Sequence, residues 1–150
     1  MTIAMPSKFV FRLTVAMFSA LPSIGNASDW IYIGSSGGGD LRVWIDKDTM
    51  RKSGSKAKTW SRWVYKKPNP LLEPGPARYF RAMQALEIYQ CDDRTSTHLQ
   101  VIKYADTEFV EQLTARTFPD DATRYEDVVP ESLGEKMMKF ACQGTEATRP

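Results

Sequence analysis

The sequence predicts an α+β fold: an antiparallel sheet of about five to six strands, with a C-terminal helix packed on it and tied to it by a disulfide. Three observations carry this prediction. Short aromatic and β-branched runs, separated by Gly, Asp and Pro, fill most of the chain after residue 28. One segment near the C-terminus has the helical spacing of apolar residues. Two cysteines, Cys91 and Cys142, stand at the predicted ends of a strand and of that helix.

The first 27 residues differ in composition from the rest of the chain. Lys8 and Arg12 precede the apolar run 13–21, and the stretch contains no acidic residue. This is the layout of a secretory signal peptide, with small residues leading up to a cleavage site that we predict before Ser28. The apolar run is too short for a transmembrane helix, which needs about 20 residues. No cysteine at the cleavage point offers a site for a lipid anchor.

Removal of a signal peptide at 1–27 leaves one exported domain, residues 28–150, without a transmembrane segment. Such a domain is periplasmic, secreted or held at the cell surface. Lys8 and Arg12 are two of the 20 basic residues, so 18 basic residues face 18 acidic ones in the domain. The formal net charge of +2 therefore comes from the signal peptide, and an exported, near-neutral domain is not expected to bind nucleic acid.

Three strands are predicted in the first half of the domain. The run 30–34 is aromatic and β-branched and ends at a glycine-rich turn, 35–39. In 41–46, residues alternate between an aliphatic face and a face that carries Arg, Trp and Asp. The polar stretch 47–54 returns the chain to a third strand, 56–65. We expect the second and third strands to pair as a hairpin.

Prolines mark the middle of the domain. Four of them fall in 66–78, and proline removes a backbone donor, so we expect a loop there that interrupts the single domain without dividing it. Two further strands follow, 81–91 and 95–104, around an Asp-rich turn. The run 109–117 is the candidate for a sixth strand.

The C-terminal segment has the signals of a helix. Ser132 followed by Glu135 has the spacing of a capping box, and Gly144 offers a stop. Helical spacing places an apolar stripe along the segment, which we expect to lie on the sheet, with Phe140 filling the contact. The stripe consists of Leu133, Met137, Phe140 and Ala141.

Cys91 and Cys142 are the two cysteines of the chain. In an oxidising compartment a pair of this kind is expected to form a disulfide, here one that joins the end of a strand to the end of the helix. A reactive or metal-binding thiol pair is the alternative. That alternative lacks a Cys-x-x-Cys spacing and has only His98 as a further ligand.

No constellation of catalytic residues stands out in the sequence. His98 is the single histidine, lies in the middle of a predicted strand, and is typical of a surface or hydrogen-bonded residue rather than a ligand. The glycine run 37–39 is not followed by the Lys-Ser or Lys-Thr pair of a phosphate loop. The Asp pairs at 92–93 and 120–121 fall in predicted turns. We therefore expect no enzymatic activity, no metal and no cofactor.

One face of the predicted hairpin combines cations with indoles. Because side chains alternate along a strand, five residues of the second and third strands share this face. They are Arg42, Trp44, Lys58, Trp60 and Arg62. Such a surface suits an extracellular-matrix protein or a polyanion, through charge pairing and cation–π contacts. The alternative is that Trp44 and Trp60 pack under the C-terminal helix or another layer, with the cations only at their edges.

Several segments, taken in order, resemble the surface-adhesin protein E family of small exported proteins from Gram-negative bacteria. They are LRVWID at 41–46, KTW at 58–60 with YKKP at 65–68, YQCD at 89–92, and VPESLGE at 129–135 followed by KFAC at 139–142. The resemblance spans nearly all of residues 28–150. It departs from the family pattern at Tyr125, where a Trp is usual, and in the proline-rich loop.

The resemblance implies an antiparallel sheet with a C-terminal helix held by the disulfide, and an adhesin-like module that binds extracellular-matrix or envelope macromolecules. A structural or envelope-maintenance protein of the periplasm, without a host ligand, is the alternative. A homodimer formed through a sheet edge is a further expectation.

Overall fold

The computed structural model describes residues 28–119 and 124–143, so the predicted signal peptide lies outside the described residues. The strands are β1 (Trp30–Ser36), β2 (Leu41–Asp46), β3 (Arg51–Ser53), β4 (Lys56–Pro70), β5 (Tyr79–Gln90), β6 (Thr95–Tyr104), β7 (Gln112–Thr117) and β8 (Glu126–Asp127). A short 3₁₀ turn at Gly37–Gly39 joins β1 to β2, and the helix is α1 (Leu133–Gln143).

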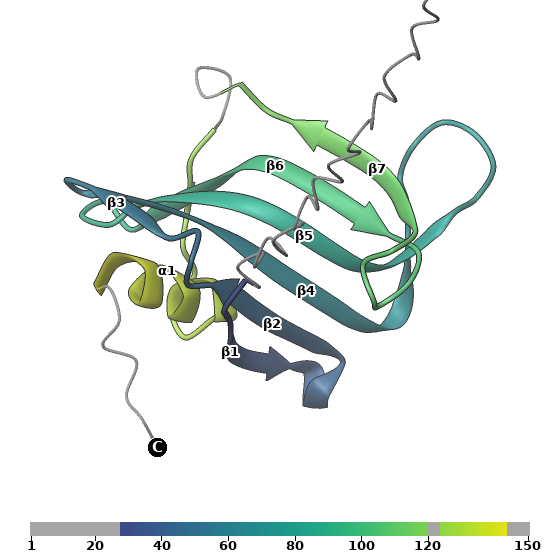
Figure 1. Cartoon of the computed structure of the whole chain (residues 1–150), viewed down its shortest axis with the longest axis horizontal. Helices are drawn as coiled ribbons and strands as arrows, with labels where there is room; N and C mark the ends of the chain where they lie inside the picture. Colours follow the sequence, from purple (N-terminus) through teal and green to yellow (C-terminus); the bar gives the residue numbers. More distant parts are fainter. Residues whose placement is uncertain (1–27, 120–123, 144–150) are drawn as a thin grey trace, which may run out of the picture.

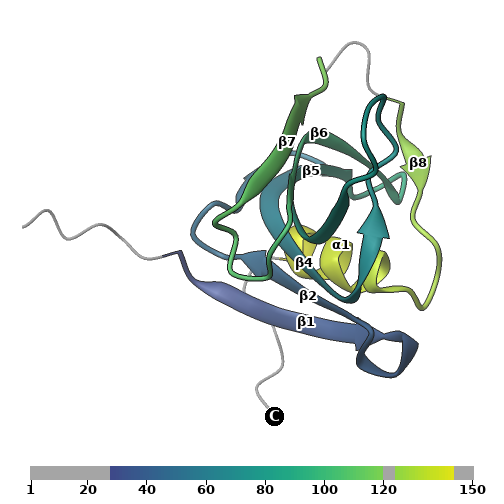
Figure 2. The same cartoon turned by 90° about the vertical axis from the view of Figure 1, so that its right-hand side faces the viewer.

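The strands form one antiparallel sheet in the order β1-β2-β4-β5-β6-β7. β3 adds to β4 and β8 adds to β6, so β1 and β7 stand at the two ends of the main order (Figure 1). The sheet curves, and α1 lies on its inner side (Figure 2). The predicted fold class, an antiparallel sheet with a C-terminal helix packed on it, is confirmed.

The strand boundaries differ from the prediction in the middle of the domain. The loop expected at 66–78 is wrong in its first part, because β4 continues to Pro70. Its register with β5 is interrupted between Val64 and Asn69, so Pro68 lies where the ladder needs no backbone donor. The segment 47–54 contains the short strand β3, which its polar composition did not predict. The last long strand, β7, begins at Gln112 rather than at residue 109.

α1 covers the aliphatic face of β2 and its neighbours. Met137 and Ala141, one helical turn apart, are fully buried against the sheet, with Met138 beside them. The sheet contributes Val43, Ile45, Ala57 and Tyr89 to this core. The expectation for Phe140 holds in part: its side chain packs against this core but is only partly buried, and Met138 is more deeply buried.

The start of α1 is organised by Ser132 and Glu135. The backbone N–H of Glu135 donates to Ser132 Oγ at 3.1 Å, as in a capping box. The Glu135 carboxylate accepts from the backbone N–H of Glu131 at 2.9 Å and pairs with Arg94 and with Lys139. The bond from Arg94, followed by that from Glu131, lowers the pKa of Glu135 to about 2. The predicted cap is confirmed, whereas Gly144 lies outside the described residues.

Cys91 and Cys142 form a disulfide, with their Cα atoms 5.8 Å apart. It joins the turn after β5 to the last turn of α1. Beside it, Lys52 Nζ donates to the carbonyl oxygen of Cys142 at 2.6 Å. The predicted covalent link between sheet and helix is therefore confirmed.

Candidate functional site

The sheet face opposite α1 carries the predicted basic and aromatic residues. Arg42 and Trp44 come from β2, and the other three come from the adjacent β4, where Arg62 lies directly opposite Trp44. Neither Trp44 nor Trp60 packs under α1, and both indoles are partly exposed. Trp44 instead packs beside Phe109 from the β6–β7 loop, over a small core of Val64, Ala82 and Tyr104.

Arg62 is enclosed between two aromatic rings. Its guanidinium carbon lies 4.0 Å from the ring centroid of Trp30 and 4.5 Å from that of Phe109. Burial lowers the pKa of Arg62, while the charges of Tyr104 and Asp46 oppose that effect. The oxygen and nitrogen of the Gln84 side-chain amide are assigned so that each has a suitable partner. In this orientation the amide oxygen accepts a hydrogen bond from Arg62 Nε at 2.9 Å, and the amide nitrogen donates one to the Tyr104 hydroxyl. Two rings and one amide of the protein therefore already contact this cation.

The β6–β7 loop holds Phe109 over Arg62. Phe109 has a φ of 64°, a left-handed conformation that is unusual for a bulky residue. The Asp106 carboxylate accepts backbone N–H bonds from Glu108 at 2.7 Å and Val110 at 3.2 Å, and also one from Glu111. The bond from Glu111 is the main cause that lowers the pKa of Asp106. This set of bonds fixes the loop and offsets the strain at its tip.

Two adjoining hollows open on this face, with volumes of about 370 and 320 Å³. They meet at Trp30 and Arg62, which line both. The first is lined by Trp30, Arg42, Trp44, Arg62, Val64, Thr107, Glu108 and Phe109, and the second by Ser28, Trp30, Asp46, Thr49, Trp60, Arg62, Gln84 and Ile102. We call the set Trp30, Arg42, Trp44, Trp60, Arg62 and Phe109 the aromatic face.

The structure brings four of the five predicted residues together at these hollows. Lys58 lines neither, because it lies further along β4, opposite Arg51 of β3. Arg42 is the exposed cation of the set, and its guanidinium carbon lies 5.6 Å from the centroid of the Trp44 ring. The charge available to a ligand therefore comes from Arg42, with Lys58 at the periphery.

Two members of the aromatic face were missed from the sequence. Trp30 could have been placed on this face from the sequence. It alternates with Tyr32, so the two side chains share a face, and antiparallel pairing places Tyr32 opposite Trp44. The ring centroids of Tyr32 and Trp44 are 5.4 Å apart. Phe109 had no such signal, because a loop with an uncommon backbone conformation delivers it to the face.

Among residues 28–119 and 124–143, no group of three or more His, Cys, Asp and Glu side chains is arranged to hold a metal ion. Over the same residues, no helix has the length and apolar character needed to cross a membrane. The aromatic face therefore combines partly exposed rings, one exposed cation and two hollows.

Residues 30–143 match the family described as surface-adhesin protein E. A solved structure, crystal form II of Haemophilus influenzae protein E, is 14% identical and superposes with a TM-score of 0.53, over 75% of this chain and 87% of that one. Protein E from non-typeable Haemophilus influenzae is 13% identical, with a TM-score of 0.52, over 82% of this chain and 81% of that one. At such identities the likeness establishes the fold alone. No protein of curated function matches this chain in sequence.

The match covers both the sheet and the helix, so the aromatic face and the disulfide lie within it. The description of this family suggests a binding protein. The chain belongs to the surface-adhesin protein E family, and this membership supports an adhesin-like surface protein.

Proposed function

We propose that this chain is an exported adhesin-like module that binds an extracellular-matrix protein or a polyanion through the aromatic face. The observation that carries the proposal is the gathering of Trp30, Trp44 and Trp60 around two hollows, on the sheet face that α1 leaves open. Tryptophan and arginine supply a large share of the binding energy at protein interfaces. An exposed cation beside partly exposed indoles also suits an anionic group.

The face is held in place before any ligand arrives. Arg62 is stacked between Trp30 and Phe109, and the hydrogen bonds of Asp106 fix the loop that carries Phe109. Side chains that are already ordered lose little conformational entropy on binding, which favours affinity. In this proposal Arg62 positions the rings, whereas Arg42 contacts the ligand.

The test is retention on immobilised heparin and on purified matrix proteins, at low and moderate salt. The double variant Arg42→Ala, Lys58→Ala removes the exposed cations on the ligand side and leaves the Arg62 stack intact. The control is Arg81→Ala, Lys136→Ala, which removes one Arg and one Lys that are exposed elsewhere and line neither hollow. We expect retention to fall in the first variant and to persist in the control.

Equal retention of the two folded variants, or no retention of the parent protein, would overturn the proposed site. Export to the cell surface is a separate part of the proposal and has its own test. Protease added to intact cells should cleave a surface-displayed protein. Release of the whole pool with periplasmic contents would instead favour the periplasmic, envelope-maintenance role.

A further inference from the structure

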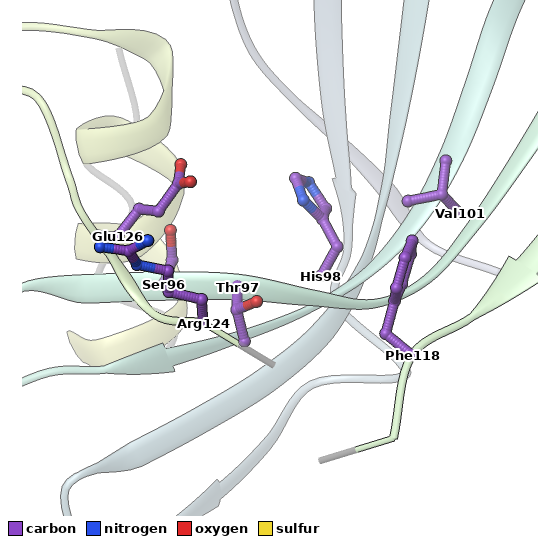
Figure 3. A pocket seen from close by; sticks show the side chains of 7 residues that line it. All are labelled: Ser96, Thr97, His98, Val101, Phe118, Arg124 and Glu126. Atoms are coloured by element: carbon purple, nitrogen blue, oxygen red, sulfur yellow. The ribbon is translucent and has the colours of Figure 1, made fainter. Parts of the chain in front are cut away.

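A second hollow region lies on the inner side of the sheet, on the same face as α1. One part has a volume of about 310 Å³ and runs between the 71–78 loop and strands β5, β6 and β7; another, of about 300 Å³, continues it. The two parts share His98, Val101 and Phe118, so they form one groove. Figure 3 shows Phe118 beside Val101 at one end and Arg124 with Glu126 at the other, with His98 between them. We call the part lined by Leu72, Glu73, Met83, His98, Val101, Lys103, Thr114, Arg116 and Phe118 the inner groove.

The inner groove is lined by four apolar side chains, of which two are partly buried and two are exposed. Met83 and Val101 contribute from the strands, while Leu72 and Phe118 contribute from the chain beyond the ends of β4 and β7. Leu72 is 89% exposed and Phe118 is 40% exposed. Exposed apolar side chains that gather along one hollow are typical of a ligand or partner site.

Positive charge is in excess along the same groove. The Glu73 carboxylate is shared by two guanidiniums, Arg116 at 2.8 Å and Arg78 at 3.3 Å. Lys103 has no carboxylate within ion-pair distance among the described residues, and its Nζ lies 4.6 Å from the centroid of the Phe80 ring. An apolar channel with unbalanced cations on its walls is complementary to a molecule with an apolar tail and an anionic head.

The polar residues beneath the groove satisfy one another. Glu87 is buried and accepts hydrogen bonds from Ser61 Oγ at 2.7 Å and from the Tyr89 hydroxyl. His98 Nε2 lies 3.6 Å from Glu87 Oε1, and hydrogen bonding to Glu87 raises the pKa of His98 against the opposing effect of burial. Glu87 is thus occupied by its own neighbours, and His98 adds a titratable cation where the two parts of the groove meet.

We propose that the inner groove binds a single-chain anionic lipid, with a carboxylate head and an aliphatic tail. The tail lies along Leu72, Met83, Val101 and Phe118, and the head pairs with Lys103 and Arg116. This site lies on the opposite sheet face from the aromatic face, so it does not depend on the adhesin proposal.

The experiment is calorimetric titration of the protein with sodium dodecanoate, at concentrations at which the lipid is monomeric. Thr114→Trp fills the groove with a large side chain. Thr117→Trp is the matched control: it lies on the same strand but, by alternation, on the other face, and it does not line the groove. Lys103→Gln keeps the side-chain size and removes the charge of one proposed head-group contact.

We expect saturable binding of dodecanoate to the wild type and to Thr117→Trp, and binding weaker by about tenfold or more in Thr114→Trp. Lys103→Gln should weaken dodecanoate binding several-fold. Dodecyltrimethylammonium, with the same tail and the opposite charge, should bind the wild type more weakly than dodecanoate.

The proposal is overturned by absence of dodecanoate binding, or by equal binding of the two amphiphiles. If Thr114→Trp does not fold, unchanged affinity in Lys103→Gln overturns the head-group assignment. Retention on heparin, governed by the other face, should be unaffected by either groove variant.

Discussion

Arg62 and Arg42 lie on adjacent strands and on one sheet face, yet their environments assign them different roles. Arg62 is flanked by two rings and contacts Gln84, whereas Arg42 is exposed and lies over one ring at a longer distance. Alternation along strands predicts only the shared face. The rings that enclose one cation and leave the other open come from β1 and from the β6–β7 loop.

Arg62→Lys should therefore destabilise the fold, because a lysine ammonium cannot stack between two rings as a planar guanidinium does. We expect a loss of about 1–2 kcal/mol in the free energy of unfolding, measured by denaturant titration. Arg42→Lys, the matched control, should change it by less than about 0.5 kcal/mol. Equal effects of the two substitutions would mean that the stack carries no stability.

His98 should make stability depend on pH in a definite direction. Hydrogen bonding to Glu87 raises the pKa of His98, and the charge of Glu126 acts in the same sense. Because the folded-state pKa lies above the unfolded one, the charged imidazole stabilises the fold most below about pH 6. This contribution is lost as the pH rises through the folded-state pKa. His98→Gln should remove this pH dependence.

The measurement is an NMR titration of the single imidazole, together with unfolding curves of wild type and His98→Gln across the same pH range. His98 is the one histidine in the chain, so its signal is unambiguous. A titration midpoint at or below that of a free histidine would contradict the proximity to Glu87.

At the scale of elements, α1 shows what helical periodicity predicts and where it stops. The cap at Ser132 and the stripe through Met137 and Ala141 follow from spacing. The deep burial of Met138 does not follow from spacing, because the rotation of the helix about its axis depends on how its side chains pack against the curved sheet. In β4, likewise, the prolines were expected to end the strand, but a break in register accommodates them.

A series along α1 tests this packing order. Met137→Ala should lower the free energy of unfolding by about 2–5 kcal/mol, because Met137 is fully buried against the sheet. Phe140→Ala should cost less than Met137→Ala, since Phe140 is only partly buried whereas Met137 is fully buried. Ser132→Ala should cost about 1 kcal/mol through the lost cap. A larger effect at Phe140 than at Met137 would mean that the helix docks through a different face.

At the scale of the whole molecule, the disulfide connects the sheet to the C-terminal helix. It closes a loop with a sequence separation of 51 residues between a sheet turn and the end of α1. Loop closure of this length should contribute about 4 kcal/mol in the chain-entropy model. Cys91→Ala, Cys142→Ala should therefore unfold at a much lower denaturant concentration. Its unfolding curve should not respond to a reducing agent, whereas that of the wild type should shift.

The fold was more predictable than the binding face. The sheet, the helix and the disulfide follow from local patterns: alternation, capping and two cysteines at element ends. The aromatic face includes Phe109, which is placed there by a loop conformation that no pattern in the sequence predicts. Lys58, which was expected on this face, lies at its periphery. A homodimer through the β1 or β7 edge stays a prediction.

Ligand binding at the aromatic face can be followed directly at the four tryptophans of the chain. Trp30, Trp44 and Trp60 line the two hollows, whereas the indole nitrogen of Trp63 donates to Ser61 on the face that α1 covers. In a two-dimensional NMR titration with a heparin oligosaccharide, the indole N–H signals of the first three should shift saturably and that of Trp63 should stay in place. Shifts confined to Trp63, or no shift in any indole signal, would contradict the account.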